Sequence, residues 1–242
     1  MKPMIKPAGD AALQVVFGNV ISPEINMKVT GFAALIKQQL VEGITDMIPA
    51  FCTLLIHYDP RIITYDLLLE KLEGLMDLNV KTKKTSARVF EIPVLYGGEF
   101  GPDLAFIATN AGLSTDEVIA IHSGKDYLIY MLGFMPGFPY LGGLDPQIHT
   151  PRLDNPRLKI PAGSVGIGGE QTGIYPLESP GGWQLLGRTP LKTYDPTREQ
   201  PILFDAGDYI RFVPISAQAY ETILKQVEEN VYEYVSYEKE ES

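Results

Sequence analysis

Glycine and proline are concentrated in one segment of this 242-residue chain, between residues 131 and 190. The segment carries 12 of the 23 glycines and nine of the 19 prolines. Long helices are incompatible with this density, because proline lacks an amide donor and glycine destabilises helix interiors. The segment also keeps many large apolar side chains, among them Trp183, which argues against disorder. We therefore expect short strands and tight turns, arranged as a closed or half-closed β-barrel.

The residues before 86 follow a different pattern. Apolar side chains at spacings of three and four predict a helix with Ser22 as N-cap and Pro23 as its first residue. A second amphipathic helix is expected over residues 64–78. Strands are expected over residues 12–17, 44–50, 51–58 and 89–95. This order suits a small antiparallel sheet backed by two helices, a ferredoxin-like arrangement.

A polar, basic run at residues 81–86 is interpreted as the boundary between two domains, with a solvated loop inside one domain as the alternative. The prediction is an α+β protein: a ferredoxin-like domain over residues 1–85 and a β-barrel domain over residues 86–242. Two short helices should open the second domain, the later one starting at a capping box from Ser114 to Glu117. A C-terminal helix capped by Ser216 should close it.

Composition is that of an ordinary globular protein, with 45% hydrophobic and 21% charged residues. No apolar run approaches the ~20 residues that span a bilayer, and the N-terminus lacks the apolar core of a secretion signal. Cys52 is the single cysteine, so no intrachain disulfide can form. A reducing, cytoplasmic location is the simplest expectation.

Charge is unevenly distributed along the chain. The net charge is −10, and residues 226–242 contribute −5, from six acidic residues against Lys239. Residues 131–190 are neutral, so they are positive relative to the rest. This balance argues against nucleic acid or an anionic membrane as the main partner. An anionic ligand would be better received in the glycine- and proline-rich segment.

Several common site motifs are absent. Gly124-Lys125 lacks the glycine and the Ser or Thr of a phosphate-binding P-loop. One cysteine and three scattered histidines give no metal-binding spacing, and we interpret His57 and His122 as structural. Ser164 lies in a near match to a nucleophile elbow, with alanine where the first glycine belongs. We favour a turn residue over a nucleophile for Ser164.

Three cations of residues 131–190 are candidates for a ligand site. Arg188 could hold a carboxylate or phosphate in a two-pronged contact, or form an ion pair. Arg157 and Lys159 flank Leu158, so on a strand they share one face and could meet a common ligand. A solvated strand face is the alternative for Lys159. We predict catalytic roles for Arg188 and Arg157, and substrate binding for Lys159.

Further polar candidates lie in the same segment. Gln171 and Tyr175 could hydrogen bond a small polar substrate, or serve as a turn amide and a core aromatic. Backbone amides at Gly168 and Gly169 could form a nest for an anion. His149 is a candidate general acid or base, with a structural role as the alternative. No metal site is predicted.

An apolar, rigid loop is the remaining candidate. It contains Phe134, Met135, Pro136 and Phe138, and it is either part of the barrel core or a contact for a partner protein. We predict these four residues as partner-binding. Trp183 is expected in the core.

Three sequence blocks together carry a resemblance to a known family. They read GFMPGFPYL at residues 133–141, IPAGSVGIGG at residues 160–169, and QTGIYP…SPGGWQLLGRTP over residues 171–190. Their order and spacing resemble the family of KipI and the bacterial 5-oxoprolinase B subunit, also called allophanate hydrolase subunit 1 or the carboxyltransferase C/D family. The N-terminal half matches by length and element order.

The resemblance implies a cyclophilin-like barrel after a small α+β domain. It further implies an ATP-dependent enzyme, a cyclic amide hydrolase, in which this chain is not active alone. The C subunit of 5-oxoprolinase would be a direct partner and the A subunit would be a further one, and together they would open 5-oxo-L-proline to L-glutamate. Phosphorylation of the lactam oxygen would place anionic charge near cations such as Arg188. ATP could be bound mainly by a partner.

Two other functions stay open at this stage. A KipI-like protein would bind a sporulation histidine kinase and inhibit it, with the apolar loop as the docking surface. Membership of a biotin-dependent urea or allophanate system is the third option, because the resemblance places the same barrel there.

Overall fold

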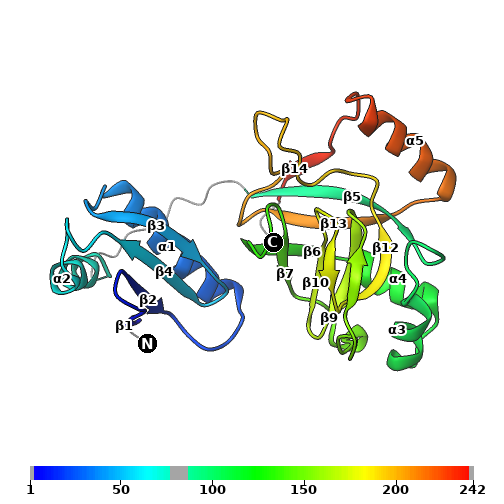
Figure 1. The fold of residues 1–242 in the computed structure, drawn as a ribbon. Helices are drawn as coiled ribbons and strands as arrows, with labels where there is room; N and C mark the ends of the chain where they lie inside the picture. The colour runs from blue at the N-terminus through cyan, green and yellow to red at the C-terminus, as the bar shows by residue number, and fades with distance from the viewer. Residues whose placement is uncertain (1–2, 77–86, 240–242) are drawn as a thin grey trace. The chain divides into compact units, whose positions relative to one another are not determined.

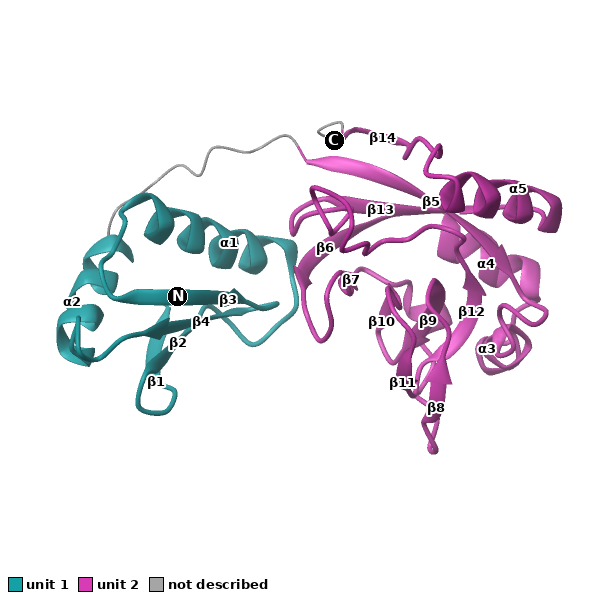
Figure 2. Ribbon diagram, turned by 45° about the horizontal axis from the view of Figure 1, so that its top comes forward, with its two compact units in different colours: residues 1–85 teal, residues 86–242 magenta. Residues whose placement is uncertain are grey.

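The computed structural model describes residues 3–76 and 87–239, so the predicted boundary at residues 81–86 lies outside the described residues. The chain divides into two compact units, residues 1–85 and residues 86–242, which Figure 2 shows in separate colours. Each unit has its own hydrophobic core.

The first unit is a four-stranded antiparallel sheet with two helices. Its strands are β1 (Met4–Pro7), β2 (Ala12–Val16), β3 (Ile44–Pro49) and β4 (Thr53–Tyr58), in the spatial order β1-β2-β4-β3. Helix α1 spans Pro23–Gln38 and helix α2 spans Tyr65–Met76. The Ser22 hydroxyl accepts the Ile25 amide at 3.3 Å, which confirms the predicted N-cap.

One predicted strand belongs elsewhere. Residues 89–95 lie in strand β5 (Arg88–Tyr96), which pairs with strands of the second unit. The edge position beside β2 is instead taken by β1, which pairs with β2 from Met4↔Val16 to Pro7↔Leu13. The four residues of β1 are too few for the sequence pattern to reveal a strand by alternation alone.

The second unit contains a closed β-barrel. Seven strands form a continuous ring in the order β12-β9-β10-β7-β6-β13-β5, and β12 pairs back onto β5 through Gly187↔Tyr96 and Arg188↔Leu95. The strands are β6 (Asp126–Leu132), β7 (Pro139–Gly142), β9 (Ser164–Gly168), β10 (Gln171–Ile174), β12 (Gln184–Arg188) and β13 (Tyr209–Pro214), with β5. The predicted barrel is confirmed, and its closure leaves no free edge among these strands.

Shorter elements complete the second unit. A two-stranded sheet joins β8 (Arg157–Ile160) to β11 (Ser179–Gly181), and β14 (Ser236–Glu238) pairs with the first residues of β5. Helices α3 (Leu104–Ala111) and α4 (Thr115–Ser123) lie near β12 in Figure 1. A 3-10 turn spans Pro146–Ile148, and helix α5 spans Ala217–Glu228. The capping box at Ser114 and Glu117 and the cap at Ser216 are both present, as predicted.

Three polar side chains, Thr172, His122 and Tyr96, form a series of hydrogen bonds in the apolar core of the barrel. The Thr172 hydroxyl donates to the Gly166 carbonyl at 3.0 Å, so it accepts from His122 Nε2 at 2.8 Å. His122 Nδ1 then accepts the Tyr96 hydroxyl at 2.8 Å. Burial lowers the pKa of His122 to about 3, which keeps the ring neutral. The structural role predicted for His122 is confirmed.

Candidate functional site

Arg188 ends strand β12 and stands directly opposite Ser164, the first residue of β9. Directly opposed residues of antiparallel strands project from the same face of the sheet. The register of β12 shifts between Leu185 and Gly187, and such a bulge changes the direction of the side chains that follow. Ser164 is the first residue of strand β9, so it does not lie in a turn, contrary to our prediction.

Two glycines allow the chain to approach this point closely. Gly163 has φ +80°, and a Cβ there would lie 2.4 Å from the Thr189 carbonyl oxygen. A Cβ on Gly101 would lie 1.8 Å from the Leu186 carbonyl oxygen. Only glycine fits at both positions, so the turn before β9 and the loop after β5 are pressed against β12.

One aromatic ring packs on the Arg188 side chain, and a second ring packs on the first. Its guanidinium carbon lies 5.0 Å from the centre of the Phe100 ring, in the loop after β5. Phe100 contacts Tyr220 of α5, with ring centres 4.8 Å apart. Burial raises the pKa of Tyr220, while the charge of Arg188 acts in the opposite direction. Four separate segments of the chain thus meet around Arg188.

Two polar atoms on this face have no hydrogen-bond partner. They are Ser164 Oγ and Arg188 Nε, and Ser164 is 0% exposed. Among the described residues, no carboxylate forms an ion pair with Arg188. Arg198 also has an unpartnered Nε, but its Nη2 donates to two carbonyl oxygens at 3.0 Å. Buried polar atoms without partners are uncommon in native proteins and mark positions where a ligand or water completes the structure.

Arg157 has a different environment. Its Nη2 donates to Asp103 Oδ1 at 2.7 Å, and its Nη1 donates to the Trp183 carbonyl at 3.3 Å. The second oxygen of Asp103 accepts the Leu185 amide at 2.7 Å. These contacts tie β8 to the start of α3 and to β12. In the described part of the chain, Arg157 and Arg188 share no side-chain partner, and a catalytic role for Arg157 stays a prediction.

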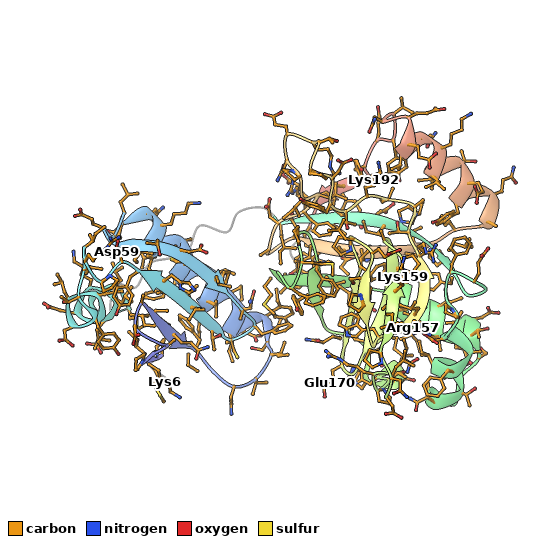
Figure 3. The ribbon with its side chains drawn as sticks, in the orientation of Figure 1. Lys6, Asp59, Arg157, Lys159, Glu170 and Lys192 are labelled. Carbon is orange, nitrogen blue, oxygen red and sulfur yellow. The ribbon has the colours of Figure 1, made fainter. Side chains whose placement is uncertain are left out.

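Lys159 lies on the same strand as Arg157, and Figure 3 labels both residues. Lys159 pairs with Glu178 at 3.0 Å, and both side chains are largely exposed. The solvated strand face considered for Lys159 is therefore what the structure shows. A ligand shared with Arg157 is not supported, because the two side chains are engaged by different acids.

The predicted anion nest is not supported at Gly169. The Gly169 amide donates to the Thr150 carbonyl at 2.8 Å, so it is not free for a ligand. Gly168 is covered by Trp183, because a Cβ there would lie 2.2 Å from the indole Nε1. Glycine is present at residue 168 because the indole ring packs directly on the strand backbone.

Tyr175 is also placed differently from the prediction. It is 3% exposed and packs with Trp183 in a small core cluster outside the barrel. Burial raises the pKa of Tyr175 to about 12. Tyr175 is thus a core aromatic, which was the alternative to substrate binding for this residue. Trp183 is a core aromatic too, as predicted. Gln171 is half-buried at the start of β10, and its role as a substrate-binding residue stays a prediction.

His149 follows the 3-10 turn, apart from the residues that meet at Arg188. Its Nε2 lies 3.1 Å from the Leu144 carbonyl, and its own carbonyl accepts the Asn110 side-chain amide at 3.2 Å. Because a ring nitrogen at that distance from a carbonyl must carry a proton, Nε2 is a donor here. The contact suits the structural alternative for His149, and a catalytic role stays a prediction.

The apolar loop is only partly exposed. Phe134 is 68% exposed and Pro136 is also exposed, whereas Met135 is half-buried. Phe138 is 2% exposed within the cluster around Trp183, so its prediction as a partner-binding residue is wrong. Phe134 adopts φ +65°, a left-handed conformation that costs free energy for a bulky residue and often marks a functional loop.

A shallow hollow of about 300 Å³ opens beside this loop. It is lined by residues 132–137 and Ile202, and neither candidate arginine contributes to it. Its lining is apolar, so it suits contact with apolar side chains more than binding of an anion.

Sequence reasoning missed three members of the arrangement at Arg188. Phe100 and Tyr220 come from segments that carried no motif, and Ser164 was interpreted as a turn residue. The near match to a nucleophile elbow was the one signal that pointed at Ser164. The glycine-rich loop that includes Gly101 was a second signal, since repeated glycines often mark a close backbone approach.

Within residues 3–76 and 87–239, no three His, Cys, Asp or Glu side chains are grouped to hold a metal ion. No single helix of the described chain is long and apolar enough to cross a membrane, although α3 and α4, bent by 93°, reach that length and composition together.

Comparison with known proteins defines the class of this two-unit, barrel-containing fold. Residues 3–204 match the profile of the carboxyltransferase domain, subdomain C and D. The chain belongs to this family. The match spans the first unit and most of the barrel, and it ends before strand β13.

Relatives with names narrow the comparison. The chain is 44% identical to the 5-oxoprolinase B subunit of Bacillus subtilis over 226 residues, covering 89% of this chain and 94% of the relative. It is 59% identical to the 5-oxoprolinase B subunit of Escherichia coli O157:H7 over 128 residues, covering 53% of this chain and 59% of the relative.

Two solved structures share the fold. The crystal structure of an uncharacterized Pyrococcus horikoshii protein is 49% identical, with a TM-score of 0.54, and covers 90% of this chain and 100% of that chain. The urea amidolyase of K. lactis has a TM-score of 0.82 at 21% identity, and covers 98% of this chain and 16% of that chain. The latter likeness concerns the fold alone.

Proposed function

We propose that this chain is the B subunit of an ATP-dependent 5-oxoprolinase, which opens 5-oxo-L-proline to L-glutamate together with the A and C subunits. The observation that carries the proposal is the 44% identity to a 5-oxoprolinase B subunit over 89% of this chain and nearly the whole relative. Two further relatives that bear the same name support it. Within this function the chain is a non-autonomous subunit.

Arg188 is the residue of this chain that best fits the chemistry. Opening a lactam with ATP develops negative charge on substrate and phosphate oxygens, and a cation near those oxygens stabilises the transition state. Arg188 has no acidic partner in the described chain, whereas Arg157 is engaged by Asp103. The donors at Arg188 and Ser164 fit one anionic oxygen group. They do not form an adenine or ribose site, so most of an ATP site would lie on a partner.

The apolar loop is the proposed contact for the C subunit. Phe134 and Pro136 are exposed, and the strained backbone of Phe134 holds its ring outward beside the apolar hollow. The same loop would serve the alternative function, inhibition of a sporulation histidine kinase. Ferredoxin-like and cyclophilin-like are our proposed descriptions of the two units, supported by element order and barrel closure. A cytoplasmic location stays a prediction.

The experiment is co-expression of this chain with the A and C subunits of 5-oxoprolinase, followed by purification and an assay of ATP hydrolysis. We expect hydrolysis that depends on 5-oxo-L-proline in the complex and none with this chain alone. Arg188→Ala should lower turnover with assembly intact, and Arg152→Ala is the matched control, because Arg152 lies near an aromatic ring but is exposed. An assembled complex without 5-oxo-L-proline-dependent hydrolysis would overturn the proposal. Reduced kinase autophosphorylation would then favour the inhibitor.

A further inference from the structure

We propose that Ser164 Oγ and Arg188 Nε together bind one oxyanion, either the carboxylate of 5-oxo-L-proline or a phosphate of ATP. The inference rests on the proposed function for the identity of the ligand, but the site itself follows from the geometry. The two side chains project from one face of two adjacent strands, and each carries a buried polar atom without a partner.

The chemistry of the two atoms selects an anion. An arginine nitrogen only donates hydrogen bonds, and a serine hydroxyl can donate one as well. A water molecule could accept both, but it would leave the guanidinium charge without a counter-charge. In the described chain that counter-charge is missing, in contrast to Arg88, Arg157 and Arg211, which each pair with a carboxylate. An oxyanion satisfies both donors and the charge at once.

The surroundings suit a ligand that enters and leaves. Phe100 stacks on the guanidinium, and the Tyr220 ring packs against Phe100 with ring centres 4.8 Å apart, so the two rings lie beside the site in the free chain. Phe100 follows Gly97 and Gly98, both at positive φ, and Tyr220 lies in the first turn of α5. We infer that the ligand enters beside Tyr220 while Phe100 stays as an apolar wall.

The first experiment titrates the full-length chain with 5-oxo-L-proline, ATP and inorganic phosphate by calorimetry. The variants are Ser164→Ala and Arg188→Gln. Their controls are Thr193→Val, which also removes a buried, unpartnered hydroxyl, and Arg152→Gln, which removes an exposed cation. We expect Ser164→Ala to weaken binding about 10-fold and Arg188→Gln about 100-fold, because bonds to a charged ligand are lost. The controls should bind as the original chain does.

The probe that binds identifies the source of the oxyanion. Binding of 5-oxo-L-proline but not of phosphate indicates the substrate carboxylate. Binding of ATP and of inorganic phosphate indicates a phosphate. A chain that binds none of the three probes, or variants that bind them as well as the original chain, would overturn the site.

The second measurement separates a ligand site from a structural role. If the Ser164 hydroxyl awaits a ligand, removing it should raise the Tm of the free chain by about 2–4 °C, because a buried atom without a partner is lost. A lower Tm with unchanged affinity would show that the hydroxyl supports the fold, and the proposal would fail.

The fate of the site is distinguishable from that of the proposed function. Hydrolysis by the assembled complex with unchanged KM values in Ser164→Ala would keep the function and reject the site. If the complex shows no hydrolysis but oxyanion binding by the chain still depends on Ser164 and Arg188, the function is rejected and the site is kept.

Discussion

The two ends of strand β12 hold contrasting polar clusters. At its start, the Asp103 carboxylate accepts from Arg157 at 2.7 Å and from the Leu185 amide at 2.7 Å. At its end, Arg188 has no acidic partner among the described residues, and Ser164 Oγ has no partner. Satisfied polar groups hold a fold together, whereas unsatisfied ones lower its stability and are retained where a ligand completes them. The contrast supports the proposed ligand-binding role for Arg188 and a structural role for Arg157.

The largest expected effect concerns Asp103, whose carboxylate is fully hydrogen bonded at the start of β12. Asp103→Ala should lower the free energy of unfolding by about 3 kcal/mol, because it leaves a half-buried guanidinium and a buried amide without an acceptor. Urea unfolding measures the change. Asp59→Ala is the matched control, since its partner Arg61 is 87% exposed and water screens the pair, so the expected change is much smaller. Equal losses in the two variants would remove the distinction between the ends of β12.

A second test extends the comparison to the hydrogen-bonded side chains of Thr172, His122 and Tyr96 inside the barrel. Folding lowers the pKa of His122 from 6.5 to about 3, so below pH 6.5 the unfolded chain binds a proton that the folded chain does not. Stability is therefore complete above pH 6.5 and falls as pH decreases toward 3. At pH 5 we expect a loss of about 2 kcal/mol from this group relative to pH 7.

Urea unfolding at pH 7 and pH 5 measures the loss. His149→Gln should retain it, and His122→Gln should abolish it because glutamine is uncharged at both values. If His122→Gln still loses the full stability between pH 7 and pH 5, other titrating groups cause the loss. Protonation of His122 would then not destabilise the barrel.

Local features of the fold could be predicted from the sequence, and pairings between distant segments could not. The caps at Ser22, Ser114 and Ser216 depend on neighbours within three residues, so the pattern sufficed. Closure of the barrel depends on Arg188↔Leu95, a pairing across more than ninety positions. The segment's density of glycine and proline indicated a barrel but could not specify which strands meet.

The same limit applies to the candidate site. Arg188 was identified because cations are few between residues 131 and 190. Ser164 and Tyr220 could not be joined to it, because strand register and the position of α5 arise from tertiary packing. Phe138 and Phe134 show the reverse problem. Four residues apart in one apolar loop, they look equivalent, yet one is 2% and the other 68% exposed.

The smallest expected effect tests whether an ion pair must be buried to stabilise the fold, as we expect for Arg157 and Asp103. Lys159 pairs with Glu178 at 3.0 Å, but its side chain is 77% exposed. Water screens such a pair and the ordering of two long side chains opposes it, so Lys159→Ala should change the free energy of unfolding by less than about 0.5 kcal/mol. It should also leave oxyanion binding unchanged. Calorimetric titration and urea unfolding measure both. A loss of binding in Lys159→Ala would return Lys159 to the site and would show that the cluster at Arg188 extends across β8.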